Sequence, residues 1–444
     1  MKIQPKICIV FTAIEGVDTD QGKLEGFKDE FKKSFAPFEM TDTFIDYTVA
    51  NNTDASRANE FIRNNDFDLV CIAAVVWTPD TTVIRLIENI CMPVVVFTTT
   101  LSPYAIGLNG AQIIAASLKE LDIEFRFIFG KVSNPKTVEK IYDFAMAAAI
   151  VRNIKSLKVG VVGGRPVIMT NLAPDEFGLK KVFGTTVFPL DFSCLEDFLK
   201  NVEVRRVDER ITEIKNSVPD IRVNDGVLGQ SVRYYLALLD MVGEFKLDAI
   251  SFNCFPFPYI KAKTCLAASN LNDIGIPAAC ESDVYSSILM YILKSITGKS
   301  CLNSDLAFED ESENAIIFSH CGCGPFTCAE SFQDIRLETH FEVKSGMAVY
   351  YPLMAKGKDA TVVNLVGREN TFRLCTLNGT TLPTKLKDFA GNPVTVKFKT
   401  NIVELINILG NEGFGHHWMV SLGNYKNIFE ELCRLLKIKG VFIE

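Results

Sequence analysis

The first 150 residues alternate between nearly continuous apolar runs and amphipathic segments, and this alternation limits the possible folds more than any other feature of the chain. The apolar runs are rich in Val, Ile and Phe, and they predict the strands KICIVFTAI, TFIDYTV, FDLVCIAAVVW and MPVVVFTTT. Apolar residues three to four positions apart predict the helices GKLEGFKDEFKKSF, DASRANEFIRNN and TTVIRLIENI between them. Strands that alternate with helices form parallel sheets covered on both faces, and burial on both faces explains why these strands are apolar throughout.

A second unit of the same kind follows a long helix predicted over residues 135–154. Its first strand is predicted in KVGVVGGRP, and later strands are predicted over 247–255 and 275–280. The two glycines of VVGGRP follow a strand, as in a dinucleotide-binding fold, but the third glycine that should open a helix is missing. We therefore expect a tight turn that lines a crevice rather than a nicotinamide site.

The pattern changes after residue 309. Short strands separated by Gly, Asn and Lys turns predict an antiparallel sheet or barrel, with two helices near the C-terminus. The predicted fold class is therefore α/β, with two doubly wound Rossmann-like units followed by a β-rich, barrel-like part. The predicted domains are 1–155, 156–308, which carries the acidic residues, and 309–444.

Composition excludes several classes of partner. The net charge is −8 and the chain contains no basic run, so we expect neither nucleic acid nor an anionic membrane as a partner. The apolar run of residues 7–13 is followed almost at once by Glu15, which predicts a buried strand rather than a signal peptide or a membrane span. The thirteen cysteines are scattered, many of them inside apolar runs, and they predict reduced core thiols in a cytoplasmic protein.

Carboxylates follow the predicted strands of the second unit. Glu281 comes directly after a strand, and a helix is predicted to begin at about Asp283. Asp305 ends the next short β-type segment, so Glu281 and Asp305 are expected at the ends of neighbouring parallel strands, facing one crevice. The alternative is structural, because acids also complement a helix N-terminus or occupy turns. From spacing alone, this alternative is slightly favoured.

Two of the four histidines are adjacent, in the segment NEGFGHHWMVS. Side chains alternate along a strand, so we expect His417 on one face and His416 with Trp418 on the other. One histidine could then enter a site while its neighbour packs elsewhere, and a surface His–Trp patch is the alternative. His320 ends the predicted strand AIIFSH and is a third candidate, whereas His340 is expected to face solvent.

Two further groups lie near predicted strand ends. In HCGCGPFTC, three cysteines and His320 could bind zinc, but the C-x-C spacing is unusual for zinc, so a glycine-rich site loop that carries His320 is favoured. Asn253 and Cys254 follow a strand of the second unit and are expected to line the same crevice, although Cys254 could belong to the core.

Four segments together resemble a known motif series. PAACESDVYSSIL, LNSDLAF, IIFSHCG and GHHWMVS are similar to the motifs of the L-fucose isomerase and L-arabinose isomerase superfamily. Their order and spacing agree with that family, including a second acid 24 residues after the first. The predicted architecture is also that of the family, so the resemblance covers essentially the whole chain.

This resemblance implies a metal-dependent aldose–ketose isomerase. Glu281 and Asp305 would be metal ligands and the acid/base pair, and His417 would be the third ligand. An enediol reaction needs a positioned base and acid and a Lewis acid for the developing oxyanion, and two carboxylates with one imidazole suit Mn²⁺. His320 matches a histidine at the metal site of the arabinose branch. His320, His416, Trp418, Asn253 and Cys254 are the predicted substrate contacts.

The resemblance also implies partners. The small-molecule substrate is a sugar, and the lack of a Lys/Arg-rich phosphate loop favours an unphosphorylated one. The family's enzymes are homo-oligomers, trimers or hexamers, in which the N-terminal unit of one subunit covers the active site of the next. The alternatives are a non-catalytic sugar-binding or regulatory protein and another metal-dependent sugar-processing enzyme on the same scaffold.

Overall fold

The computed structural model describes residues 2–16, 21–254, 264–342, 346–369 and 371–444. The chain forms two compact units. The smaller unit comprises residues 3–152 and 427–435, and the larger comprises 1–2, 153–426 and 436–444. Each is described by itself below. Phe255, the last residue of the strand predicted over 247–255, lies outside the described residues.

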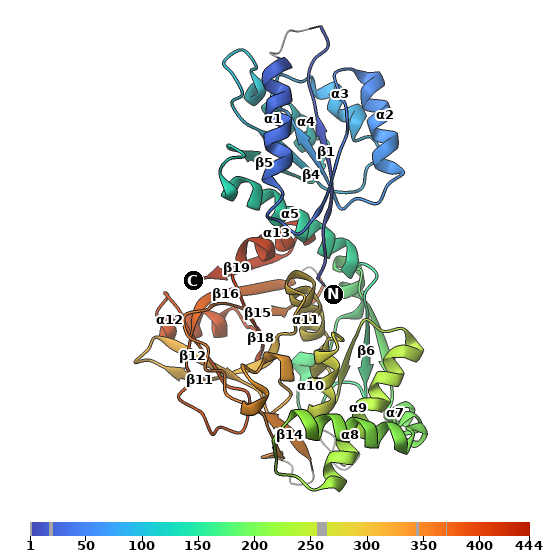
Figure 1. Ribbon diagram of the computed structural model, residues 1–444, viewed down its shortest axis with the longest axis vertical. Helices are drawn as coiled ribbons and strands as arrows, with labels where there is room; N and C mark the ends of the chain where they lie inside the picture. The colour runs from blue at the N-terminus through green and yellow to red at the C-terminus, as the bar shows by residue number, and fades with distance from the viewer. Residues whose placement is uncertain (1, 17–20, 255–263, 343–345, 370) are drawn as a thin grey trace. The chain divides into compact units, whose positions relative to one another are not determined.

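The smaller unit is built on a parallel five-stranded sheet with the order β2-β1-β3-β4-β5 (Figure 1). Its strands are β1 (Lys6–Phe11), β2 (Thr41–Phe44), β3 (Leu69–Ala73), β4 (Val94–Thr98) and β5 (Phe125–Phe129). Its helices are α1 (Gln21–Ser34), α2 (Asn52–Arg63), α3 (Asp80–Leu86), α4 (Gly107–Glu120), α5 (Pro135–Ile154) and α13 (Lys426–Leu436). The prediction missed β5 and α4, and it placed α5 correctly.

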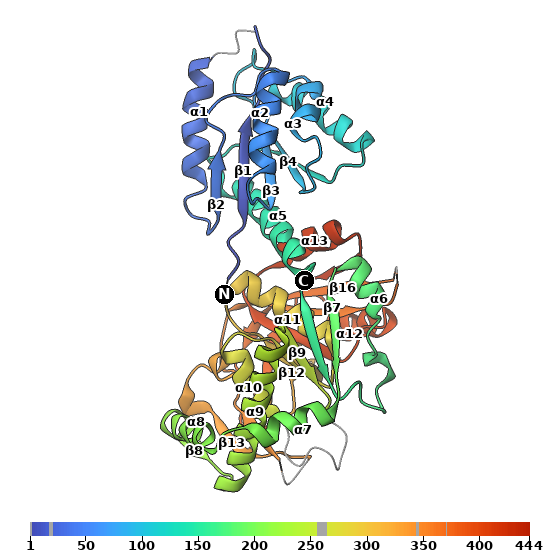
Figure 2. The same ribbon diagram turned by 90° about the vertical axis from the view of Figure 1, so that its right-hand side faces the viewer.

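Helices cover both faces of this sheet, as the apolar strands predict. Along β1, Ile7 and Ile9 face a core shared with α1 and α5, whereas Cys8 and Val10 face a core shared with α2, α3 and α4. Figure 2 shows α1 and α2 on either side of the strands. Because side chains alternate along the strand, β1 contributes residues to two separate cores, one on each face of the sheet.

The larger unit contains a second parallel sheet, with the order β10-β9-β6-β7. Its strands are β6 (Lys158–Val162), β7 (Thr186–Leu190), β9 (Ala249–Phe252) and β10 (Ala278–Cys280). Helices α6 (Glu176–Val182), α7 (Phe192–Asn201), α8 (Val204–Ser217), α9 (Asp225–Phe245), α10 (Cys265–Asp273) and α11 (Val284–Thr297) accompany it. A small sheet joins β8 (Asp220–Ile221), β13 (Arg336–Thr339) and β14 (Met347–Tyr350).

Six antiparallel strands of the larger unit close into a barrel, because β15 pairs with both β16 and β18 (Figure 1). They are β11 (Leu302–Asp310), β12 (Ala315–Ser319), β15 (Asp359–Val366), β16 (Arg373–Leu382), β17 (Val394–Lys397) and β18 (His417–Leu422). Strand β19 (Lys439–Ile443) adds to β16 in parallel, and α12 (Ile402–Asn411) precedes β18. The predicted fold class, Rossmann-like α/β with a barrel-like C-terminal part, is confirmed.

One local prediction is wrong. Asp305 was expected at the end of a parallel strand beside the strand of Glu281, but it lies inside β11, an antiparallel barrel strand that pairs with β12 and β18. The barrel therefore begins at Leu302, before the predicted boundary at residue 308. The division of the chain into three domains stays a prediction. None of the described helices is long and apolar enough to span a bilayer.

Candidate active site

Glu281 is presented by an unusual turn between β10 and α11. Both Glu281 and Ser282 have left-handed backbone conformations, with φ of 60° and 57°. Two such residues without glycine cost on the order of 1–3 kcal/mol each and persist only where surrounding contacts impose them. Here the Ser282 backbone N–H donates to Phe252 O, and its hydroxyl donates to Gly164 O at 2.6 Å. The strain of this turn lowers stability, and the contacts that impose it hold the Glu281 carboxylate in a fixed place.

His417 and Asp305 are brought together by strand register. They are directly opposed in the antiparallel pair of β18 with β11, so their side chains lie on the same face. His417 Nε2 is 3.9 Å from Asp305 Oδ1 and 3.4 Å from Glu281 Oε2. The backbone of His417 is fixed by Asn364, whose Nδ2 donates to the His417 carbonyl at 2.7 Å. Three side chains from two sheets therefore meet, as the sequence predicted; their roles remain predictions.

Asp283 orients the His417 ring. His417 Nδ1 donates to Asp283 Oδ2 at 2.8 Å, and the same oxygen accepts the Ser286 hydroxyl at 2.6 Å. The other oxygen, Oδ1, caps α11 by accepting the Ser286 backbone N–H at 3.1 Å. Because Nδ1 carries the proton, the Nε2 lone pair of the neutral ring faces the carboxylates of Glu281 and Asp305, where it can bind a cation. A carboxylate behind a histidine in this way is typical of metal-binding histidines.

Contrary to what side-chain alternation along a strand predicts, the ring of His416 does not point to the face opposite His417. Its Nε2 is 3.2 Å from Glu281 Oε2, so both rings of the pair approach the same carboxylate. The expectation that the two rings point to opposite faces is wrong because β18 begins at His417, and His416 still lies in the preceding bend. The His416 side chain is 39% exposed, whereas that of His417 is 2% exposed. His416 is thus the more accessible of the two.

His320 follows β12 and lies beside His417, with ring centroids 5.4 Å apart. Its Nδ1 accepts the Cys321 backbone N–H at 2.9 Å, so in the neutral ring the proton is on Nε2. Burial opposes protonation of His320, but Cys321 and Asp305 outweigh it and raise the pKa of the ring to about 10. Nε2 carries a hydrogen in either charge state. His320 is therefore a hydrogen-bond donor at the site.

Three buried polar atoms at the centre of this cluster are unsatisfied. Among the described residues, Asp305 Oδ1, His417 Nε2 and His320 Nε2 have no hydrogen-bond partner. A cation with bonds of about 2.1 Å holds its ligand atoms roughly 3–4 Å apart, which the His417 separations from both carboxylates match. His417 belongs to one group of possible metal ligands with Glu281 and His416 and to another with Asp305 and His320. This mixture of carboxylate and imidazole donors fits a divalent cation.

The charges in the cluster are strongly coupled. Burial raises the pKa of Glu281, but contacts with His416 and His417 outweigh it, so the net pKa lies below its ordinary value and the carboxylate is ionised. Burial lowers the pKa of His417, but its hydrogen bond to Asp283 and the nearby charge of Glu281 dominate and raise the pKa well above its ordinary value. A proton on Nε2 thus occupies the position that a cation would take.

The structure does not bring every predicted residue to this cluster. Trp418 is 2% exposed and packs in the larger unit's core against Phe318 and Phe414. Asn253 is buried and donates to Gly163 O, and Cys254 is buried in the same core. Asp283 is the site residue whose role the sequence reading missed, since it was interpreted only as a helix-terminal acid. A signal was present, because it stands two residues after Glu281 at a helix start.

A cavity of about 420 Å³ in the larger unit opens beside the cluster and is lined by His416, His417, Asn364, Arg368 and Arg373 among others. The Arg373 guanidinium donates to the carbonyls of Glu412 and Gly413, so it supports the segment that leads to His416. Arg368 is exposed, and within the described part of the chain only its Nη2 donates a side-chain hydrogen bond, to Ala173 O. Most of its donors therefore remain for a ligand.

Comparisons with known proteins find several relatives that share one name. The chain is 24% identical over 388 residues to the sulfoquinovose isomerase of Priestia aryabhattai, which covers 85% of this chain and 86% of the relative. It is 29% identical over 359 residues to that of a Clostridium species (strain MSTE9), with 76% of each chain covered. The relative from Alkalicoccus urumqiensis, of the same name, is 24% identical over 341 residues, again with 76% of each chain covered. No family model matches the sequence.

The chain is a sugar isomerase, an intramolecular oxidoreductase. The alternative of a non-catalytic sugar-binding or regulatory protein is therefore wrong. The similarity spans most of this chain and most of the relative.

Proposed function

We propose that this isomerase is a metal-dependent aldose–ketose isomerase of the fucose and arabinose isomerase-like group, acting on an unphosphorylated sugar through an enediol. One observation carries the proposal. Asp305 Oδ1 and His417 Nε2 are buried without hydrogen-bond partners among the described residues, beside an ionised Glu281. Such atoms are costly to bury unless a ligand satisfies them.

Glu281, Asp305 and His417 would hold the cation, and Mn²⁺ suits this donor set. When bound, a divalent cation supplies Lewis-acid stabilisation to oxygens that become negative in the enediol. Asp283 keeps the proton of His417 on Nδ1 and so keeps the Nε2 lone pair directed at the two carboxylates. The strained turn fixes the backbone of Glu281 and so helps to hold its carboxylate in position.

Proton transfer falls to the two carboxylates in this proposal. Glu281 is ionised and therefore suited to take the proton from the sugar carbon. Asp305, whose side chain is 37% exposed, would handle the proton on the neighbouring carbon or oxygen. His320 would donate its Nε2–H to a substrate oxygen, which favours a substrate contact over a metal ligand for this residue.

The substrate that we propose is a sulfonated sugar such as sulfoquinovose. The relatives bear that substrate in their names, and the cavity beside the cluster carries an arginine with spare donors, Arg368. A guanidinium binds a trigonal oxyanion through two parallel hydrogen bonds. Arg373 is less suited to this role because backbone carbonyls already occupy its guanidinium.

The first experiment tests metal and reaction together. Protein stripped with a chelator should convert sulfoquinovose to its ketose only after a divalent cation is restored, with Mn²⁺ the best of a panel. The metal content should be one per chain. Full activity of verified metal-free protein would overturn the metal-dependent part. Absence of ketose from every sugar in an aldose panel would overturn the reaction.

A second experiment tests the substrate class. Arg368→Ala should raise KM for the sulfonated sugar at least about tenfold while leaving turnover of glucose unchanged, because glucose lacks the anionic group. Arg368→Lys should recover part of the loss, since lysine keeps the charge but not the paired donors. An equal effect of Arg368→Ala on both sugars would remove Arg368 from substrate recognition.

We also propose that the enzyme is a homo-oligomer in which the smaller unit covers the site of another subunit. The support in this chain is an apolar segment of the smaller unit in which Tyr104 is 87% exposed and Ile106 is 55% exposed. Dilution to monomer, followed by sedimentation and assay together, should reduce turnover. A fully active monomer would contradict this arrangement.

A further inference from the structure

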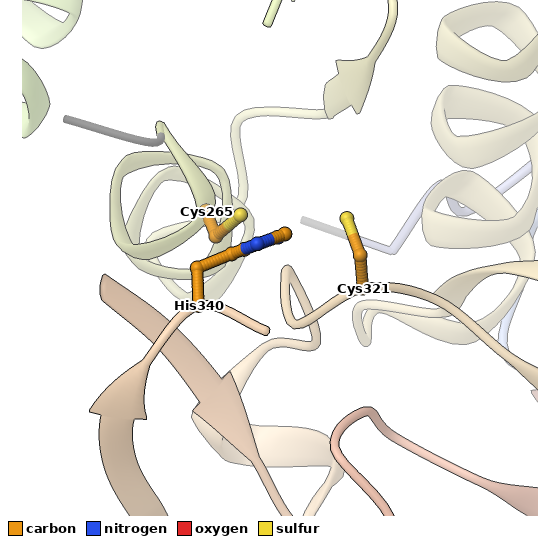
Figure 3. A group of neighbouring side chains, drawn as sticks. All are labelled: Cys265, Cys321 and His340. Carbon is orange, nitrogen blue, oxygen red and sulfur yellow. The ribbon is translucent and has the colours of Figure 1, made fainter. Parts of the chain in front are cut away.

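A second group of metal-type ligands lies outside the proposed catalytic centre. Cys265 opens α10, Cys321 follows β12, and His340 follows β13. Figure 3 shows the His340 imidazole reaching into the space between the two cysteine side chains. The sulfur atoms and a ring nitrogen all lie within 4.8 Å of one another. His340 is 1% exposed, so the expectation that it faces solvent is wrong.

The group differs from the zinc alternative considered from sequence. That alternative joined Cys321, Cys323 and Cys328 with His320, but among the described residues these four do not form one group of ligand atoms. Cys323 groups with Cys280 and His320, and Cys328 has its thiol directed at Ser300 O. Cys321 is instead paired with a cysteine 56 positions earlier in the sequence, which no spacing rule in the loop could reveal.

The ring of His340 is oriented by a backbone contact. Its Nδ1 accepts the Glu342 backbone N–H at 3.1 Å, so in the neutral ring the proton is on Nε2. A ring in this form donates from Nε2 rather than ligating a cation through it. The group therefore consists of two thiols, which release their protons when they bind a cation, and an N–H donor beside them, rather than of three metal ligands.

We propose that Cys265 and Cys321 bind one soft, two-coordinate cation of the Cu(I) type as a pair of thiolates, with His340 donating a hydrogen bond to one sulfur. The two sulfur atoms lie within 4.8 Å of each other, near enough for one cation to bind both. Thiolates select soft cations such as Cu(I) over Mn²⁺ or Mg²⁺.

Burial and charge favour this site over its neighbours. Two thiolates and a monovalent cation leave one net negative charge, which a buried site tolerates only with a hydrogen-bond donor nearby. Cys321 is partly exposed and offers a path of entry, whereas Cys280 and Cys323 are 1% and 3% exposed. Neither cysteine is among the proposed catalytic residues, although Cys321 contacts His320, with Sγ 3.2 Å from Nδ1.

Copper transfer tests the proposal directly. The parent for all variants is Cys91→Ser, which removes an exposed thiol that would bind copper by itself. Under anaerobic conditions, the reduced full-length protein is titrated against a coloured Cu(I)–chelator complex, and bleaching reports transfer. The expected result is one Cu(I) per chain. Cys265→Ser and Cys321→Ser should each abolish transfer, and His340→Ala should weaken binding by about 10–100-fold without changing the stoichiometry.

Cys323→Ser is the matched control, because this thiol is buried on the same loop two residues away. It should bind copper as the parent does. Loss of transfer in Cys323→Ser with retention in Cys321→Ser would overturn the assignment. X-ray absorption of the copper-loaded parent does not depend on variant folding: two sulfur neighbours support the site, and nitrogen or oxygen ligands alone would refute it.

Discussion

The two parallel sheets of this protein share an architecture but differ in the polar side chains at the ends of their strands. At the strand ends of the first sheet, polar side chains satisfy each other: the Thr12 and Thr78 hydroxyls are 3.0 Å apart, and Thr98 Oγ1 donates to Ala74 O at 2.8 Å. After the last strand of the second sheet, Glu281 follows a strained turn and meets buried atoms of the barrel that lack partners among the described residues.

This difference shows which features distinguish a site from a scaffold. Parallel sheets gather polar residues beyond the carboxyl ends of their strands in both cases. In the first sheet the hydroxyls of Thr12, Thr78 and Thr98 are neutral and hydrogen-bonded. In the second, a carboxylate is held where the barrel supplies His417 and Asp305, and the unsatisfied atoms favour a cation.

The largest expected effect comes from removing the barrel's contribution. His417→Ala should abolish stoichiometric metal binding and lower kcat/KM by at least about 10²–10⁴-fold, because the remaining carboxylates lose their third ligand. Metal analysis after gel filtration, together with the isomerase assay, measures both. A variant that retains a full equivalent of metal would show that the two sheets do not share a cation.

A smaller loss of metal affinity should follow when the His417 ring is kept but the hydrogen bond that orients it is removed. In Asp283→Asn, the single amide oxygen cannot serve both the α11 cap and His417, so metal affinity should fall about 10–100-fold. Competition with a chromophoric chelator measures the affinity. Ser286→Ala is the control, since it keeps the Asp283 carboxylate, and it should bind metal nearly as the wild type does. Equal losses in both variants would argue against orientation by Asp283.

His416→Ala should spare the metal and change the pH profile. The His416 contact helps to lower the pKa of Glu281, so its removal raises that pKa toward the ordinary value. Glu281 then becomes protonated at a higher pH on acidification. The acid limb of the pH profile of kcat/KM should therefore move to higher pH. Metal content measured in parallel should remain one per chain. A loss of metal with an unshifted limb would assign His416 to the cation instead.

The smallest effect is expected in the first sheet. Thr78→Val leaves the buried Thr12 hydroxyl without its neighbour and should reduce the free energy of unfolding by about 1–2 kcal/mol. Turnover at saturating substrate should not change, because this strand end has no part in the proposed chemistry. Urea unfolding and the standard assay test the two statements. A fall in kcat without loss of stability would contradict the contrast between the sheets.

Much of the fold was predictable because it depends on local periodicity. Apolar runs gave four strands of the first parallel sheet and three of the second, where β7 was missed, and helix α5 was predicted with its observed bounds. Short or weakly patterned elements were missed, such as β5, in which only Ile128 is fully buried. The site residues were found because Glu281, Asp305 and His417 stand in a recognisable motif order.

The sequence by itself determined the element types, the sheet class and the identities of the residues that meet. The tertiary structure decided how they meet. Antiparallel register opposed Asp305 to His417, the start of β18 turned His416 toward Glu281, and backbone N–H groups fixed the tautomers of His320 and His340. These outcomes depend on pairing between segments far apart in the chain, and local periodicity contains no information about that pairing.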